Sequence, residues 1–142
     1  MWIGMRISLG VLLLAAATLL TACIPTGWAI DEAWSPAQTA AIVAALDEWR
    51  AVCGVPFHVD PSSEHVVRRL TQRGTEWIPT ASGSYYDGQI EILNLEPGRL
   101  YIVARHELGH ALGLSERDDP GHVMSRGGDA CQPAALPVED CP

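Results

Sequence analysis

The segment His106-Glu107-Leu108-Gly109-His110 constrains the fold of this chain more than any other feature, because it sets ionisable side chains in an apolar helical pattern. Residues four apart lie on one face of an α-helix, so the two imidazoles can reach one metal ion. Glu107 lies one step round the helix, where it can take a proton from a water molecule on that ion. The surrounding positions predict a buried helix, in which unpaired imidazoles and carboxylates would be costly; they are Leu100, Ile102, Val103, Leu108, Ala111 and Leu112.

Residues 106–125, HELGHALGLSERDDPGHVMS, resemble the active-site segment of matrixins, a family of zinc peptidases in the metzincin clan. In that family, HExxHxxGxxH is followed by a loop and a methionine turn. Gly113 matches the glycine that ends the helix, where a residue free to adopt positive φ lets the chain turn back beneath the metal. Met124 matches the turn methionine. The resemblance disfavours the simpler interpretation, a pair of ordinary core histidines without a metal.

The resemblance implies Zn²⁺ as cofactor and an endopeptidase that hydrolyses protein or peptide substrates. His106 and His110 would bind the metal, and Glu107 would act as general base on the water that attacks the peptide bond. The implied fold is a small twisted sheet packed against two helices. Metzincins hold their substrate as an added antiparallel strand along a sheet edge, and Gly83–Leu93 is the segment expected to supply that edge.

One position departs from the family pattern: Glu116 stands where matrixins have their third histidine. Two histidines and a glutamate are an established catalytic zinc set, so Glu116 is the expected third ligand. Asp118, Asp119 and His122 are the alternatives, because they lie in the same loop. A carboxylate neutralises more of the metal's charge than an imidazole does, so a weaker Lewis acid is expected.

The C-terminal part also departs from the family, in which a further helix shapes the pocket for the side chain that follows the cut. Residues 126–142 are rich in glycine and proline and too short for much helix. The alternative function is therefore a non-catalytic surface lipoprotein that uses a metzincin-like zinc domain as a binding module. Glu107 favours the enzyme, because that residue serves catalysis and is not a ligand.

Residues 1–22 predict a targeting segment. Arg6 precedes the apolar run Leu9–Leu20, which is shorter than the about 20 residues that a membrane-spanning helix needs. The sequence Leu20-Thr21-Ala22-Cys23 resembles a bacterial lipobox, which implies a lipid on Cys23 and anchoring at the periplasmic face of the outer membrane or the cell surface. An ordinary signal peptide and an uncleaved anchor are the alternatives. Residues 23–34 are then expected to be a lipidated N-terminus and tether, or a first strand.

The formal net charge is −8, and it becomes −9 if Arg6 is removed with the targeting segment. Such a charge speaks against nucleic acid as a partner, and the sequence sets no oligomeric state. An exported protein meets an oxidising compartment, where disulfides persist. Cys131 and Cys141 close a short loop and are the first choice for a pair, with Cys53 bonded to either of them as the alternative.

The remaining pattern predicts one α+β (mixed α/β) domain over residues 35–142. Ser35-Pro36 predicts a capped helix start, and the apolar spacing over 37–52 predicts a helix that ends at Gly54. Val55–Val59 is rich in β-forming residues and predicts a strand.

Residues 62–80 fit a helical turn or a strand equally well, whereas Gly83–Asn94 predicts a hairpin or bulge followed by a half-buried strand. Glu96-Pro97-Gly98 predicts a turn, with the metal-binding helix beginning at Arg99. Both helices are expected to pack on one face of a small sheet.

Overall fold

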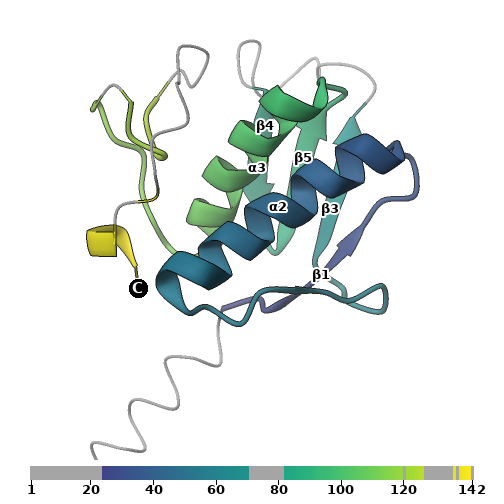
Figure 1. The fold of residues 1–142 in the computed structure, drawn as a ribbon, viewed down its shortest axis with the longest axis horizontal. Coiled ribbons are helices and arrows are strands. Elements are labelled where there is room, and N and C mark those ends of the chain that lie inside the picture. The colour runs from purple at the N-terminus through teal and green to yellow at the C-terminus, as the bar shows by residue number, and fades with distance from the viewer. Residues whose placement is uncertain (1–23, 71–81, 120, 127–135, 137, 142) are drawn as a thin grey trace, which may run out of the picture.

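The computed structural model describes residues 24–70, 82–119, 121–126, 136 and 138–141. It contains a mixed five-stranded sheet and two long helices, which confirms the predicted α+β class (Figure 1). Cys23, the targeting segment and Cys131 lie outside the described residues. Among those that are described, no helix combines the length and the apolar character needed to cross a membrane.

The sheet has the strand order β2-β1-β3-β5-β4. Its strands are β1 (Gly27–Ile30), β2 (His58–Val59), β3 (Val66–Leu70), β4 (Gly83–Tyr86) and β5 (Gln89–Leu93). Strands β2, β1, β3 and β5 pair in parallel, whereas β4 pairs with β5 in the antiparallel direction. The antiparallel strand therefore stands at one end of the sheet, and no described strand pairs with its outer edge.

Two predictions about strands can be compared with the sheet. Of the two alternatives for residues 23–34, a tether or a first strand, the structure has a strand over Gly27–Ile30, where β1 lies inside the sheet and Trp28 is fully buried. The strand expected over 55–59 is limited to its last two residues. Pro56 cannot donate a ladder hydrogen bond, and Phe57 instead turns into the core, edge-on to Trp28 at 6.2 Å between ring centroids.

Helix α2 (Pro36–Cys53) begins and ends as its sequence predicts. The Ser35 side chain accepts a hydrogen bond from the backbone N–H of Gln38, and the backbone N–H of Ser35 donates to the Gln38 side chain. Gly54 ends the helix with φ 66°. The side-chain NH₂ of Gln38 also donates to Asn94 Oδ1 at 2.9 Å and to the Leu95 carbonyl at 2.7 Å. These bonds tie the start of α2 to the connection between β5 and the next helix.

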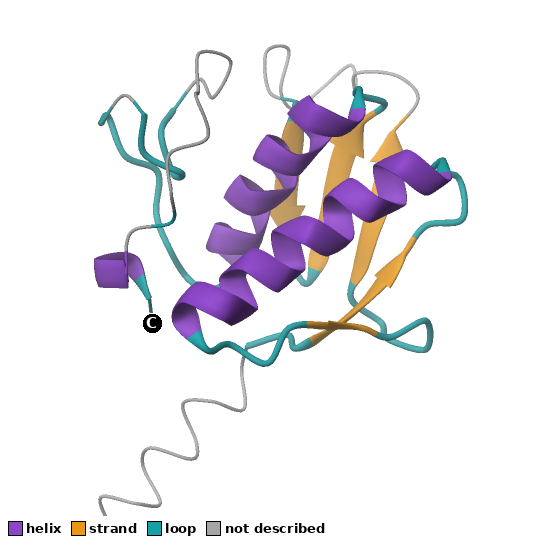
Figure 2. Cartoon of the chain, in the orientation of Figure 1, coloured by secondary structure: helices purple, strands orange, loops and turns teal. Residues whose placement is uncertain are grey.

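Helix α3 (Pro97–Ala111) begins two residues before the predicted start at Arg99. Proline suits the first helical position, because its φ is already helical and its missing N–H would have no partner there. Both helices cover the same face of the sheet, as predicted (Figure 2). Trp49 of α2 is fully buried between them and donates its indole N–H to the Arg105 carbonyl of α3 at 3.0 Å.

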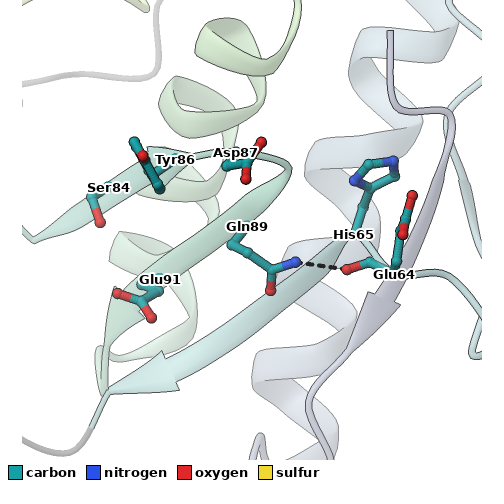
Figure 3. Close-up of a pocket in the computed structure, with 7 residues that line it drawn as sticks. All are labelled: Glu64, His65, Ser84, Tyr86, Asp87, Gln89 and Glu91. Atoms are coloured by element: carbon teal, nitrogen blue, oxygen red, sulfur yellow. Dashed lines mark hydrogen bonds between the residues drawn. The ribbon is translucent and has the colours of Figure 1, made fainter. Parts of the chain in front are cut away.

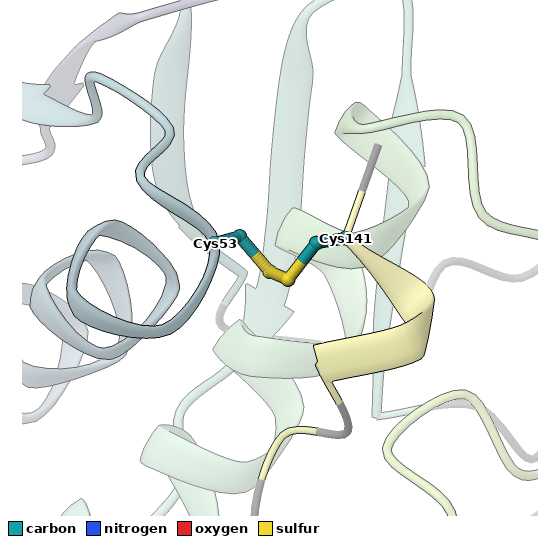
Figure 4. The surroundings of a disulfide bond; sticks show 2 residues. All are labelled: Cys53 and Cys141. Carbon is teal, nitrogen blue, oxygen red and sulfur yellow. A yellow bond between two sulfur atoms is a disulfide. The ribbon is translucent and has the colours of Figure 1, made fainter.

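A disulfide joins Cys53, at the end of α2, to Cys141, near the C-terminus (Figure 4). The first-choice pair Cys131–Cys141 is therefore wrong, and the alternative that pairs Cys53 with Cys141 is confirmed. The short loop between Cys131 and Cys141 favours their pairing, but the burial of the tail against the core favours the bond to Cys53. Leu136 is only 4% exposed within the core, which returns the tail to α2 just before the short 3₁₀ turn η2 (Val138–Asp140).

Candidate metal centre

His106, His110 and Glu116 come together at the C-terminal end of α3. One ligand atom from each lies within 4.8 Å of the other two. Among the described residues, these three form the group that could hold a metal ion. Oε1 of Glu116 lies 3.2 Å from Nε2 of His106 and 3.3 Å from Nε2 of His110. The helix supplies the histidines, and the loop that follows it supplies the carboxylate.

Backbone carbonyls fix the orientation of both imidazoles. Nδ1 of His106 lies 2.8 Å from the Val123 carbonyl, and Nδ1 of His110 lies 2.9 Å from the Leu114 carbonyl. A carbonyl oxygen can only accept, so each Nδ1 donates to it, and Nε2 is the ring nitrogen that each histidine turns toward Glu116. Metal-binding histidines are held in this way by partners outside the metal's own ligand shell.

The two separations from Glu116 Oε1 fit a tetrahedral zinc ion. Bonds of about 2.0–2.1 Å at a tetrahedral centre put neighbouring ligand atoms roughly 3.3 Å apart, which agrees with the two distances from Glu116 Oε1, 3.2 and 3.3 Å. Three protein ligands would leave a fourth position open, as in catalytic rather than structural zinc sites.

The three alternative ligands point elsewhere. His122 Nδ1 accepts a hydrogen bond from the Met124 amide at 3.0 Å, and its Nε2 lies 3.2 Å from the Arg117 guanidinium. Asp118 is nearly fully exposed and faces Arg126 at 3.6 Å. Asp119 is also exposed and does not join the group of potential ligands. Of the four candidates, Glu116 is thus the one that the fold brings to the histidines.

The helix ends at the site in a manner that holds the second histidine. Gly113 has φ 88°, its amide donates to the His110 carbonyl at 2.9 Å, and the Leu114 amide donates to the Gly109 carbonyl at 3.0 Å. This is a Schellman motif, in which a left-handed glycine reverses the chain after the last helical turn. The reversal places the Leu114 carbonyl against His110, as described above.

Met124 packs against the helix at Gly109. It is 1% exposed, and a Cβ atom added to Gly109 would lie 2.3 Å from its sulfur. The Arg117 amide donates to the Met124 carbonyl at 2.8 Å, so the loop closes on itself at this residue. The adjoining Val123 carbonyl is thereby positioned to accept from His106.

Glu107 is 5% exposed and faces the sheet next to the ligand group. Burial, and secondly the negative charge of Glu116, raises the pKa of Glu107 to about 8. A carboxyl group with a pKa near neutrality suits proton transfer at physiological pH. A divalent cation nearby would lower the pKa of Glu107 instead, because it favours the ionised carboxylate.

The start of β4 lies directly against Glu107. A Cβ atom added to Gly83 would stand 2.7 Å from Cγ1 of Val103 and 3.0 Å from Oε1 of Glu107. This contact was not predicted from the sequence, because nothing near Gly83 signals an approach to residues 20 and 24 positions further along the chain. Tyr85, two residues on, faces the same side and packs on the core, whereas Tyr86 is exposed.

A buried charge network, also not predicted, joins the two helices one residue before the first histidine. Arg105 is 3% exposed, and its Nε lies 2.9 Å from Oε2 of Glu48. The Tyr101 hydroxyl donates to the same carboxylate oxygen, and the Arg105 guanidinium lies over the Tyr101 ring at 5.3 Å. The spacing of Tyr101 and Arg105, four residues apart on one helix, is the signal that could have pointed to this network.

No protein-family model and no curated protein sequence matches this chain. The matrixin resemblance therefore rests on residues 106–125, and the assignment of chemistry rests on the geometry of the site.

Proposed function

We propose that this protein is a zinc-dependent endopeptidase. The observation that carries the proposal is the convergence of His106 Nε2, His110 Nε2 and Glu116 Oε1 beside the buried carboxyl group of Glu107. Three ligands with an open fourth position, next to a proton acceptor that is not itself a ligand, are what metal-assisted hydrolysis requires.

When bound, zinc would polarise the carbonyl of the scissile peptide bond and acidify a water molecule. Glu107 takes the proton of the attacking water and returns it to the leaving amine. The carbonyls of Val123 and Leu114 keep the imidazoles in one tautomer and one orientation. Buried surroundings, which include Met124, keep the ligand-bearing helix rigid.

The substrate would extend the sheet as a further antiparallel strand on the free edge of β4. Main-chain hydrogen bonds supply affinity in this binding mode, and side-chain pockets supply specificity. The closeness of Gly83 to Glu107 supports this placement, because a strand added beside the start of β4 would lie near the proposed catalytic base.

The second candidate is a non-catalytic zinc domain that binds a partner. The observation in its favour is the tail: among the described residues after Met124, the helical structure is limited to the three-residue 3₁₀ turn η2, which precedes the Cys53–Cys141 disulfide. We propose for either function that the protein is exported and anchored in a bacterial membrane through a lipid on Cys23. Mass spectrometry of the mature N-terminus tests the anchor, since an unmodified or uncleaved N-terminus would contradict it.

Digestion of casein by the zinc-loaded mature protein tests the enzymatic proposal, with Glu107→Gln as the inactive variant and Glu32→Gln as a matched control at an exposed carboxylate. We expect cleavage by the wild type and by Glu32→Gln only. Full zinc occupancy without any Glu107-dependent cleavage of casein or of a peptide library would favour the binding module.

A further inference from the structure

The face of the sheet that α2 and α3 leave uncovered carries a hollow of about 560 Å³ (Figure 3). Its walls come from β4, from β5 and from the turn before β3. Ser84 and Tyr86 of β4 and Gln89 and Glu91 of β5 project from this side. The hollow therefore adjoins the free edge along which the substrate of the proposed function would lie.

Negative charge dominates this hollow. Glu64, Asp87 and Glu91 are three carboxylates among its lining residues. Arg68 stands opposite Glu91 in the register of β3 and β5, but its guanidinium donates to Gln89 Oε1 at 3.4 Å. That arginine lies on β3, on the side of the hollow away from the free edge. A cationic group that arrives from the edge therefore meets carboxylates first.

The alternation of side chains along β4 decides what reaches the hollow. Gly83 faces α3, so its neighbour Ser84 faces the opposite side, where it pairs with Glu91 of β5. A substrate residue paired with Ser84 would project to the same side as Ser84. Serine is small, so a long side chain can lie across it and bring its end to Glu91.

We propose that this hollow is a specificity subsite that selects lysine or arginine in the substrate. This inference rests on the proposed endopeptidase function and goes beyond it by naming a substrate class. The occupant follows from charge complementarity, because a flexible cationic side chain is the group that can cross Ser84 and meet carboxylates on the far side.

The selected residue lies on the N-terminal side of the cut. Glu107 adjoins Gly83, so the scissile bond would lie near the start of β4. A strand that is antiparallel to β4 runs toward its own N-terminus as β4 runs from Gly83 to Tyr86. The residue beside Ser84 therefore precedes the cut.

Matched peptides test the subsite: one sequence that the protein cleaves, with lysine, glutamine or glutamate placed in turn at each of the three positions before the cut. The wild type is compared with Glu91→Gln and Glu91→Lys, and Glu32→Gln is the control at a carboxylate remote from the hollow. Exposed ion pairs are weak, so we expect a roughly two- to fivefold preference in kcat/KM for lysine over glutamine at one position. Glu91→Gln reduces that preference, Glu91→Lys reverses it toward glutamate, and Glu32→Gln leaves it unchanged.

Binding of the same peptides to zinc-loaded Glu107→Gln protein, measured by fluorescence anisotropy, separates this inference from the proposed function. A preference for lysine that disappears with the added Glu91→Lys change supports the subsite even without turnover, in which case the endopeptidase proposal fails alone. Cleavage or binding that is equal for lysine and glutamate peptides, or a preference unchanged by Glu91→Lys, overturns the subsite.

Discussion

Oε1 of Glu116 lies 3.2 Å from Nε2 of His106, so a loop residue joins the two helix histidines in the proposed set of zinc ligands. We expect Glu116→Ala to weaken zinc binding by at least tenfold, because the protein would lose an anionic ligand. Asp118→Ala is the matched control, since that carboxylate points toward Arg126. Competition with a chromophoric chelator measures both affinities. Stoichiometric, unweakened zinc in Glu116→Ala, with loss in Asp118→Ala or Asp119→Ala, would reverse the assignment.

The pKa of Glu107 predicts how the stability of the zinc-free protein depends on pH. Burial and the charge of Glu116 raise this pKa from the ordinary 4.5 to about 8. Between these values the folded state holds a proton that the unfolded state releases, so the free energy of unfolding falls as pH rises from about 4.5 to 8. The full cost, reached above the folded pKa, is at most about 5 kcal/mol.

Urea unfolding in EDTA across this pH range measures the effect, with Glu107→Gln as the reference. The glutamine variant shares all other titrating groups, so the difference between the two proteins isolates Glu107. We expect Glu107→Gln to be the more stable protein at pH 8 and the difference to shrink toward pH 5. Parallel pH profiles for the two proteins would show that Glu107 is not buried as described.

The position of Gly83 against Glu107 predicts that one substitution can reduce catalysis without changing zinc binding. A methyl group there would press on Cγ1 of Val103 at 2.7 Å and on Oε1 of Glu107 at 3.0 Å. We expect Gly83→Ala to lower kcat by about tenfold or more through displacement of the base, with zinc affinity unchanged. Adding Val103→Ala frees space beside the new methyl group and should restore part of the activity. Full activity in Gly83→Ala alone would remove Glu107 from its place against β4.

The Glu48–Arg105 pair predicts a large stability loss when one charge is removed. Arg105 is buried and Glu48 is about one-fifth exposed, so Glu48→Gln should cost about 2–3 kcal/mol, less than a fully buried pair would. The double change Glu48→Gln with Arg105→Met should recover part of that loss, because no charge is then left unpaired. Chemical denaturation of the wild type and the two variants provides the comparison. A cost below about 0.5 kcal/mol for Glu48→Gln would mark the pair as a surface contact.

The disulfide predicts that the tail depends on Cys53 for its attachment. Cys53→Ser removes a cross-link between residues 88 apart in sequence. The free energy of unfolding should fall by about 4–5 kcal/mol, because the unfolded chain regains the entropy that closing this loop had removed. Cys131→Ser is the matched control and should leave the Cys53–Cys141 bond intact in a non-reducing peptide map. A map that contains Cys131–Cys141 instead would contradict this connectivity.

Local patterns predicted the elements that carry their own signals. Ser35 with Pro36, and the apolar spacing that follows, marked α2, and the alternation in Gln89–Leu93 marked β5. The parallel pairing of β1 with β3 was not predictable in the same way, because Gly27–Ile30 has too few residues for a pattern. Its assignment depends on burial of Trp28 in a core that distant segments build.

At the site, the spacing of His106 and His110 was sufficient to predict which side chains meet. The third ligand could be named only as one of four, because the path of a loop depends on hydrogen bonds between its ends, such as that from Arg117 to Met124. The contacts that Gly83 and Glu48 make with α3 were not predicted, since both residues approach the helix from other elements. Long-range packing is what the local sequence does not encode.

The most direct test of the proposed endopeptidase activity is the kcat/KM of the zinc-loaded wild type on an internally quenched peptide, compared with that of Glu107→Gln at equal zinc content. We expect cleavage within the peptide chain by the wild type and a loss of at least about 100-fold in the variant, the lower range for a positioned general base. Equal rates in the two proteins, or no cleavage by either at full zinc occupancy, would contradict it.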